Sequence, residues 1–195
     1  MPFDTTGDAQ DEALLIAAAA GDAAATRALT ARLGPIVYAH ALRMLGPDRA
    51  EAEDVTQEAL LRLWRAAPGW TVGGAKPTTW LYRVTANLCI DRLRKRRGDM
   101  PLDDAIDPPD PTPSVESQMQ ARDRAAALDA ALGTLPDRQR QAVILRYIDG
   151  LSLAETAQIM DIGPRAVESL AARGRKALAA RLLPQRAALA PGQEG

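Results

Sequence analysis

The feature that most limits how this chain can fold is an acidic, proline-rich stretch between residues 99 and 121. It contains no Lys or Arg, and five prolines lie between Pro101 and Pro113. Proline cannot continue a helix, and a segment so poor in apolar side chains cannot offset the entropy of ordering. Its acidic residues are Asp99, Asp103, Asp104, Asp107, Asp110 and Glu116. We therefore predict a flexible linker over residues 98–116, between one domain at 10–97 and another at 117–186.

Both domains are expected to be all α-helical, because Ala and Leu dominate and apolar residues recur at helical rather than alternating spacing. The 195 residues include one His and one Cys, too few for a zinc site of three or four ligands. Cys89 has no partner for a disulfide, and no signal-peptide pattern begins the chain. We predict a cytoplasmic protein with no metal, cofactor or membrane insertion.

A polar stripe runs along the helix expected at residues 80–97. One apolar face comprises Trp80, Leu81, Val84 and Leu88, and the other comprises Tyr82, Ala86, Cys89, Ile90 and Leu93. Between these faces lie Arg83, Asn87 and Arg94, with Asp91 close by. The helix should therefore pack on two sides and expose one polar edge. Asn and Arg on such an edge are suited to hydrogen bonding with DNA bases.

The same helix ends in five cations within six residues, and Gly98 after them is expected to cap it. These cations are Arg92, Arg94, Lys95, Arg96 and Arg97. A helix C-terminus favours positive charge, so a solvated helix end is the plainer explanation for the cations alone. The neighbouring Asn87 and Arg83 favour the alternative, in which the cations contact phosphates.

A turn-rich loop, PGWTVGGAKP, precedes this helix. Aromatic side chains beside a basic groove can stack on unpaired bases, although most aromatic residues belong to the core. We expect Trp64 and Trp80 to be core residues. Trp70 and Lys76 lie in the loop and are expected to be freer to meet a ligand.

An acidic helix is expected upstream, in DRAEAEDVTQEALLRLWRAAP. Asp48 is the predicted N-cap, and the helix should end before Pro68. Its inward face comprises Ala52, Val55, Ala59 and Leu63, and its acidic face comprises Glu51, Glu53, Asp54, Gln57 and Glu58. A surface helix is often acidic simply because it is solvated. A basic protein partner explains this face better than acid–base catalysis, which requires a pocket.

The second domain carries the pattern of a helix-turn-helix. A helix is predicted from Pro136 to Gly150, and Ser152 with Glu155 forms a capping box for the next helix. A short turn at residues 161–163 leads to a last helix that begins at Pro164. The residues expected to pack this junction are Ala157, Met160, Ile162, Val167 and Leu170, and the cations of the last helix are Arg165, Arg173, Arg175, Lys176 and Arg181. A plain helical hairpin is the alternative.

Two DNA-facing helices on a tether of about twenty residues, which can stretch to roughly 60 Å, indicate a site in two parts. The sequence pI is only about 5.9. Because phosphate neutralisation supplies most non-specific affinity, such a chain should bind DNA weakly by itself and act within a larger assembly.

The motifs AEDVTQEALLRLW, TTWLYRVTANLCIDRLR and LPDRQRQAVILRYIDGLSLAETAQIM, with the acidic linker between the last two, occur in an order that resembles bacterial sigma factors of the extracytoplasmic-function (ECF) group. The resemblance spans about residues 11–182. It implies two helical domains, core RNA polymerase and promoter DNA as partners, and an inhibitory anti-sigma factor. It also implies that the linker runs through the polymerase cleft.

Three binding surfaces follow from the resemblance. The surface for core polymerase would comprise Glu53, Asp54, Gln57 and Glu58. The minus-ten promoter element would meet Trp70, Lys76, Arg83, Asn87, Asp91, Arg94, Lys95 and Arg96, and the minus-thirty-five element Arg165, Ala166, Glu168, Ser169, Arg173 and Lys176. In the family, the loop corresponding to residues 70–77 holds a base flipped out of the non-template strand, which costs a few kcal/mol of stacking.

This sequence departs from the family pattern at several positions. Glu168 and Leu170 replace an expected cation and an expected Arg, so the minus-thirty-five sequence cannot be inferred. Thr85-Ala86 replaces a common Ala-Arg pair, which removes one possible phosphate contact. Asp161 replaces the usual Gly of the turn, and Asp tolerates the left-handed conformation.

Two other functional classes, a free-standing DNA-binding regulator and an enzyme, fit the residues less well. A free-standing helix-turn-helix regulator would leave the acidic helix and the Asn/Arg helix unexplained. An enzyme is disfavoured, because the sequence shows no nucleophile–base pair and no glycine-rich phosphate loop followed by Lys-Ser/Thr.

Overall fold

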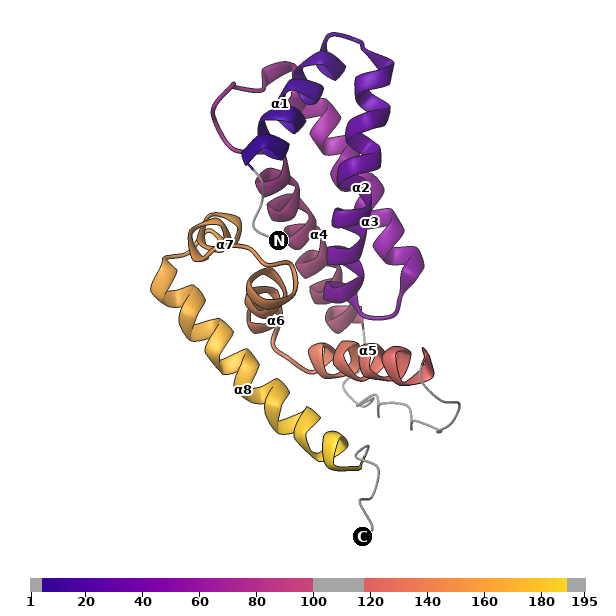
Figure 1. Ribbon diagram of the computed structural model, residues 1–195, viewed down its shortest axis with the longest axis vertical. Coiled ribbons are helices and arrows are strands. Elements are labelled where there is room, and N and C mark those ends of the chain that lie inside the picture. Colours follow the sequence, from indigo (N-terminus) through magenta and orange to yellow (C-terminus); the bar gives the residue numbers. More distant parts are fainter. Residues whose placement is uncertain (1–4, 100–117, 189–195) are drawn as a thin grey trace.

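The structure is a computed structural model that describes residues 5–99 and 118–188. Within these ranges the chain is helical and contains no strand, which confirms the all-α prediction (Figure 1). Most of the predicted linker, residues 100–116, lies outside the described residues.

The first domain is a bundle arranged around α2, which packs against α1, α3 and α4. Its elements are α1 (Thr5–Ala19), α2 (Ala23–Leu45), α3 (Arg49–Ala66), the short 3₁₀ turn η1 (Ala67–Gly69) and α4 (Pro77–Asp99). Asp side chains cap the N-termini of α2 and α3. Asp22 accepts hydrogen bonds from the backbone N–H groups of Ala24 (2.7 Å) and Ala25 (3.1 Å), and Asp48 accepts one from Glu51 (3.0 Å). Each cap contributes about 1 kcal/mol, and the cap predicted at Asp48 is confirmed.

The predicted C-terminus of α4 is wrong by two residues. Gly98 is helical, and the helix continues to Asp99 instead of ending at Arg97. Glycine inside a helix costs about 1 kcal/mol relative to alanine. Here the last turn is supported by Arg97, whose Nε donates to the carbonyl oxygen of Leu93 at 3.3 Å.

The second domain contains the predicted helix-turn-helix. Its elements are α5 (Gln118–Gly133), α6 (Asp137–Val143), the π-helical turn η2 (Ile144–Ile148), α7 (Leu153–Met160) and α8 (Pro164–Ala188). Ser152 and Glu155 form both hydrogen bonds of the capping box, as predicted. Asp161 adopts the left-handed conformation, with φ 54° and ψ 48°, so it does replace the usual glycine of the turn. The helix α5 was not predicted individually.

Gly174 allows α8 to cross α6 at close range. A Cβ atom on this glycine would lie 2.6 Å from Cγ2 of Val143 and 3.2 Å from the carbonyl oxygen of Gln139. Such a contact would force the two helices apart, so the close crossing depends on glycine.

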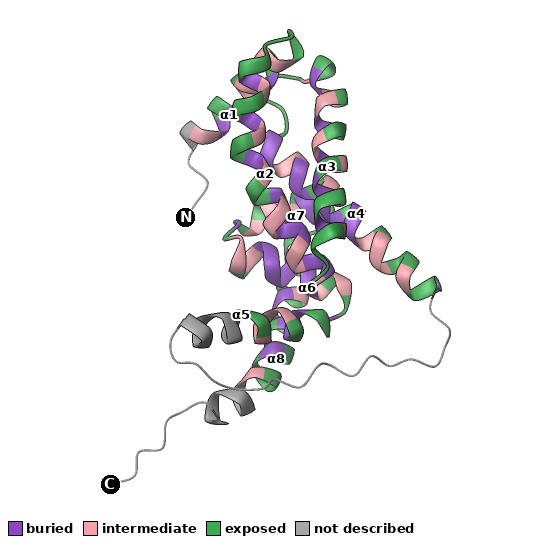
Figure 2. Cartoon of the chain, turned by 90° about the vertical axis from the view of Figure 1, so that its right-hand side faces the viewer, coloured by how far each residue is buried: buried purple, intermediate pink, exposed green. Residues whose placement is uncertain are grey.

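The two domains pack against each other and do not keep separate cores. In Figure 1, α6 and α7 lie between α8 and α4, and Figure 2 shows buried residues gathered in the middle of the molecule, around α6 and α7. The helices α4 and α6 both contact α2. One buried cluster includes Leu29, Leu33 and Met44 of the first domain together with Leu132 and Ile144 of the second. The first domain also adds a residue to the second cluster: Tyr82 of α4 packs there with residues of the helix-turn-helix.

Two buried polar contacts anchor this packing. The carboxylate of Asp149 lies 2.8 Å from Nδ1 of His40 and 3.0 Å from Nη1 of Arg43. Arg140 donates from Nη1 to the carbonyl oxygen of Met44, at the end of α2, at 2.6 Å. The side chains of His40 and Asp149 are 0% and 4% exposed, so water cannot easily replace the partner of either.

Candidate nucleic-acid interface

The surface predicted to meet the minus-ten element comprises Arg83, Asn87, Asp91 and Arg94 and is named the promoter edge after that prediction. It is the exposed edge of α4. On both sides of it the helix is buried, with Leu81 at 1% exposure and Ala86 and Cys89 at 0%. The prediction that this helix packs on two sides and exposes one polar stripe is therefore confirmed. Burial on two sides fixes the rotation of the helix, so the four polar side chains share one direction.

The predicted DNA-facing residues of α4 differ in how far they are already engaged. Arg94 lies 3.8 Å from Asp91, and both are well exposed. Arg96 is held more firmly, because its Nη2 donates to Asp48 at 2.7 Å and also contacts Glu51 of α3. Within the described ranges, Asn87 and Lys95 make no side-chain hydrogen bond or ion pair. Lys95 is therefore freer than Arg96 to meet a phosphate.

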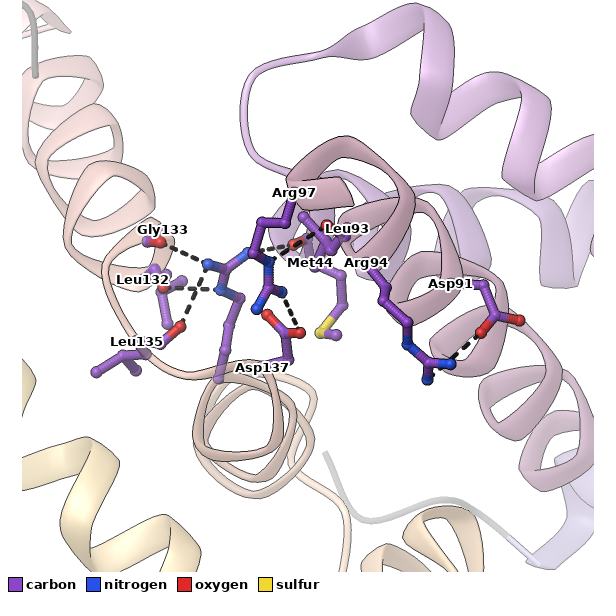
Figure 3. A network of polar contacts seen from close by, with 10 residues as sticks. Met44, Asp91, Leu93, Arg94, Arg97, Leu132, Gly133, Leu135 and Asp137 are labelled. Atoms are coloured by element: carbon purple, nitrogen blue, oxygen red, sulfur yellow. Dashed lines mark hydrogen bonds and ion pairs between the residues drawn. The ribbon is translucent and has the colours of Figure 1, made fainter. Parts of the chain in front are cut away.

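Carboxylates of the second domain pair with cations on or beside the promoter edge. Arg83 lies 3.2 Å from Asp161 in the helix-turn-helix turn. At the C-terminal end of α4, Arg97 contacts Asp137 of α6, as Figure 3 shows. Close to this pair, the carbonyl oxygens of Leu132, Gly133 and Leu135 accept hydrogen bonds from the guanidinium of Arg140. In this conformation the edge is thus partly covered by its own chain.

Trp70 and Lys76, expected to be free, are both engaged in this structure. Trp70 packs against the core, and its ring meets that of Trp80 edge-on, with an interplanar angle of 73° and 6.1 Å between the ring centroids. Lys76 lies 2.6 Å from Asp8 and 3.7 Å from Glu155 of the second domain. The hydrogen bond to Asp8 raises the pKa of Lys76, so the ammonium remains charged. Trp64 and Trp80 pack against the core, as predicted.

The acidic ridge, defined as Glu53, Asp54, Gln57 and Glu58, lies on the outer face of α3. Its inward face is completely buried, with Ala52, Val55, Ala59 and Leu63 all at 0% exposure. Glu58 pairs with Arg62 one turn along the helix at 2.8 Å, and this hydrogen bond lowers its pKa. The other three side chains are exposed and make no hydrogen bond or ion pair with any described side chain.

The helix-turn-helix presents its own exposed face along α8. The predicted minus-thirty-five residues Arg165, Ala166, Glu168, Ser169, Arg173 and Lys176 are all exposed. Val167 and Ala171, between them in sequence, are buried in the junction as the helical spacing requires. Arg175 lies over the ring of Tyr147, 5.7 Å from its centroid.

Two sequence models cover both domains: sigma-70 region 2 matches residues 29–98, and sigma-70 region 4 matches residues 125–178. The chain is 34% identical over 159 residues to the ECF RNA polymerase sigma factor SigW of Bacillus subtilis, covering 73% of this chain and 80% of the relative. It is 33% identical over 178 residues to the ECF sigma factor SigF of Caulobacter vibrioides, covering 88% and 93%. The chain belongs to the ECF group of RNA polymerase sigma factors.

The fold of this sigma factor is also similar to solved structures. One is CnrH in complex with the cytosolic domain of CnrY, with a TM-score of 0.66 and 27% identity over 89% of this chain and 97% of CnrH. Another is RpoE in complex with the anti-sigma factor NepR from Bartonella quintana, with a TM-score of 0.60 and coverage of 80% and 95%. At 22% identity the second likeness concerns the fold alone.

Sigma factors are transcription initiation factors, and this one directs core RNA polymerase to specific promoters. The match to region 2 accounts for the acidic helix and the Asn/Arg helix. A free-standing helix-turn-helix regulator would leave both unexplained.

Sequence reasoning missed the residues that join the two domains of the sigma factor. Asp149 is 109 residues from His40 and 106 from Arg43, and no local pattern links positions so far apart. The sequence offered one signal for this contact: His40, the single His of the chain, lies three residues before Arg43 on α2. It could indicate a shared helix face but not the partner.

The described part of the sigma factor shows no grouping of three His, Cys, Asp or Glu side chains that could hold a metal ion. Burial raises the pKa of the Cys89 thiol to about 12, so the thiol is neutral at physiological pH. Within the same residues, no helix is both long and apolar enough to cross a membrane.

Proposed function

We propose that this sigma factor divides its work among three surfaces. The acidic ridge binds core RNA polymerase, the promoter edge and the 70–77 loop bind the minus-ten element, and the exposed face of α8 binds the minus-thirty-five element. The observation that carries this proposal is the rotation of α4. Burial of the helix on two sides leaves Arg83, Asn87 and Arg94 in one exposed row, where side chains of these types can reach base edges.

The three surfaces belong to domains with the predicted boundaries, 10–97 and 117–186. The protein acts in the cytoplasm and performs no chemistry of its own, since positioning of polymerase and DNA is its whole contribution. The acidic ridge suits this role, because Glu53, Asp54 and Gln57 are exposed, unpaired within the described residues and backed by a rigid buried face. Rigid presentation lowers the entropy cost of binding a partner.

Promoter binding is easier when the second domain moves away from α4. One guanidinium nitrogen of Arg83 is paired with Asp161, and the Lys76 ammonium, held by Asp8 of the first domain, also lies 3.7 Å from Glu155 of the second. Exposed ion pairs of this kind contribute only about 0–1 kcal/mol each, so phosphates of a bound promoter can replace them. Core polymerase would hold the two domains apart while each binds its own promoter element.

An anti-sigma factor is the proposed inhibitory partner. The solved chain CnrH is similar to this sigma factor over 89% of the length of the sigma factor, and CnrH is bound to the cytosolic domain of CnrY. By analogy, we infer that this sigma factor also binds an inhibitory protein. Co-purification of the sigma factor from its native cell tests this: recovery of a partner that blocks promoter-dependent transcription supports it, and an inhibitor-free preparation from uninduced cells contradicts it.

Run-off transcription with core polymerase tests the central proposal. The double variant Asp54→Ala/Gln57→Ala should lose at least about tenfold of its promoter-dependent product, because interface residues at the centre of a contact contribute the most energy. Binding of the variant to core polymerase should fall in parallel. Its circular dichroism should match that of the parent, since both side chains are exposed. Full activity in the double variant would overturn the assignment of the ridge.

A further inference from the structure

The helix α1 contacts the loop at residues 70–77 through two carboxylates one turn apart. Oε1 of Glu12 accepts a hydrogen bond from the backbone N–H of Gly73 at 2.9 Å. Oδ1 of Asp8 accepts one from the hydroxyl of Thr78 at 3.1 Å, and its Oδ2 lies 2.6 Å from Nζ of Lys76. The tip of the loop and its C-terminal end are therefore both held by one face of α1.

The tip of the loop is a tight turn with a defined shape. The N–H of Gly74 donates to the carbonyl oxygen of Thr71 at 3.1 Å, and Gly73 has a φ of +74°. A positive φ at the third residue of a turn favours glycine. The side chain that this turn presents outward is Val72, which is 69% exposed. Gly73, which follows Val72 directly, is the residue that donates the hydrogen bond to Glu12.

The helix α1 is itself fixed to the bundle, so it can serve as a support. The carboxylate of Asp11, which is buried, accepts a hydrogen bond from Nε of Arg32 on α2 at 2.7 Å. The other end of the same guanidinium contacts Gln10 at 3.2 Å. At its N-terminal end the loop is fixed by the packing of Trp70 against Trp80. The turn at residues 71–74 therefore lies between two fixed points.

We propose that Glu12, with Asp8, is a positioning residue for the 70–77 loop and thereby sets base preference at the promoter position that the loop binds. This inference rests on the proposed function of the loop. Glu12 fixes the loop backbone at Gly73, and Asp8 holds the side chains of Lys76 and Thr78 at the C-terminal end of the loop. Because a turn held only at its two ends could adopt several orientations at its tip, loss of the Glu12 contact would let the loop accept several bases with similar affinity.

The test uses the full-length sigma factor with core polymerase and a set of promoters that differ only in the base held by the loop. We expect Glu12→Ala to reduce the ratio between the best and the worst base by about threefold to tenfold, the value of one solvent-exposed hydrogen bond. Glu12→Gln should restore the ratio, because its amide oxygen can still accept from Gly73. Gln10→Ala is the matched control: it loosens α1 at Arg32 without touching the loop, and should leave the ratio unchanged.

Hydrogen exchange gives a second readout that does not depend on transcription. The amide of Gly73 should exchange faster in Glu12→Ala than in the parent, and at the parental rate in Glu12→Gln. An unchanged base ratio in Glu12→Ala would overturn the inference. So would an equal loss at every base in both Glu12→Ala and Gln10→Ala, which indicates only a weakened helix. If the parent itself shows no preference at this base, the proposed function of the loop fails instead.

Discussion

The acidic ridge on α3 and the promoter edge on α4 belong to the same domain, but their surroundings differ. Glu53, Asp54 and Gln57 are exposed and contact no described side chain by hydrogen bond or ion pair. On α4, by contrast, Arg83 and Arg97 pair with carboxylates of the second domain. In this conformation the surface proposed for polymerase is open and the surface proposed for DNA is partly closed. The difference favours an order of events in which polymerase binds first.

The polarity of the contact between the domains supports this order. Every ion pair that crosses between the domains in the described ranges joins a cation of the first to a carboxylate of the second. The pairs are Arg43 with Asp149, Lys76 with Glu155, Arg83 with Asp161, and Arg97 with Asp137. Nδ1 of His40 also contacts the carboxylate of Asp149. Glu155 and Asp161 pair with Lys76 and Arg83, two of the cations proposed to bind DNA, and Asp137 pairs with Arg97 beside them. If these cations do bind DNA, the pairs give a structural reason for the weak DNA binding expected of the free chain.

The largest expected effect comes from removing the buried anchor between the domains. Asp149→Ala leaves His40 and Arg43 without their carboxylate, and breaking a buried ion pair costs about 3–5 kcal/mol. The free energy of unfolding in urea should fall by roughly this amount. Glu53→Ala on α3 is the control, because Glu53 is exposed and makes no ion pair with a described residue, and its effect on stability should be small. Equal stability of the Asp149 variant and the parent would show that the domains do not depend on this contact.

The next effect tests the closed promoter edge directly. In the triple variant Asp137→Asn/Glu155→Gln/Asp161→Asn, the Gln can keep the capping box and the Asn tolerates the left-handed turn. Without the three carboxylates, the free sigma factor should bind a single-stranded minus-ten oligonucleotide about threefold to thirtyfold more tightly, as measured by fluorescence anisotropy.

A matched control separates this local effect from net charge. Asp103→Asn/Asp104→Asn/Asp107→Asn removes the same number of negative charges from the linker, and should bind the oligonucleotide as the parent does. If both triple variants gain equally, the second domain does not compete with DNA. Transcription with core polymerase should be similar for the parent and both variants, because polymerase already separates the domains.

A smaller effect should distinguish the residues of α4 from one another. Lys95→Ala should weaken binding by about 1 kcal/mol at all sequences and reduce the salt slope by about one, as expected for a phosphate contact. Asn87→Ala should instead lower activity only at some minus-ten sequences. Arg96→Ala should also weaken binding equally at all sequences. It should in addition lower the stability of the fold, since Arg96 pairs with Asp48 and Glu51. Equal losses from Asn87→Ala and Lys95→Ala across a promoter library would contradict this division.

The smallest effect is expected on the face of α4 opposite the promoter edge. Cys89 is completely buried, and burial raises the pKa of its thiol to about 12. The native protein should therefore react with a thiol reagent only as it unfolds, and Cys89→Ala should cost about 1 kcal/mol of stability without changing promoter selectivity. Rapid modification of the native protein, or altered selectivity, would reveal a role that burial does not explain.

Much of the local structure could be predicted because it depends on residues that are close in sequence. The cap at Asp48, the capping box of Ser152 and Glu155, and the left-handed turn at Asp161 each involve contacts within a few residues. The polar stripe of α4 was predictable for the same reason, since helical spacing alone decides which side chains share a face. The end of this helix was not, because one glycine changes the helix energy by only about 1 kcal/mol.

The sequence by itself thus determined the all-α class, the polar and apolar faces of α3 and α4, the helix-turn-helix, and the family to which the chain belongs. Only the tertiary structure decided that the domains share a core, that Asp149 joins His40 to Arg43, and that α1 holds the 70–77 loop. The hydrogen bonds of Asp149 and of Glu12 join residues 61 to 109 positions apart. Helical periodicity shows which side chains face inward but not which distant surface they meet, and that pairing depends on the shape and charge of the whole molecule.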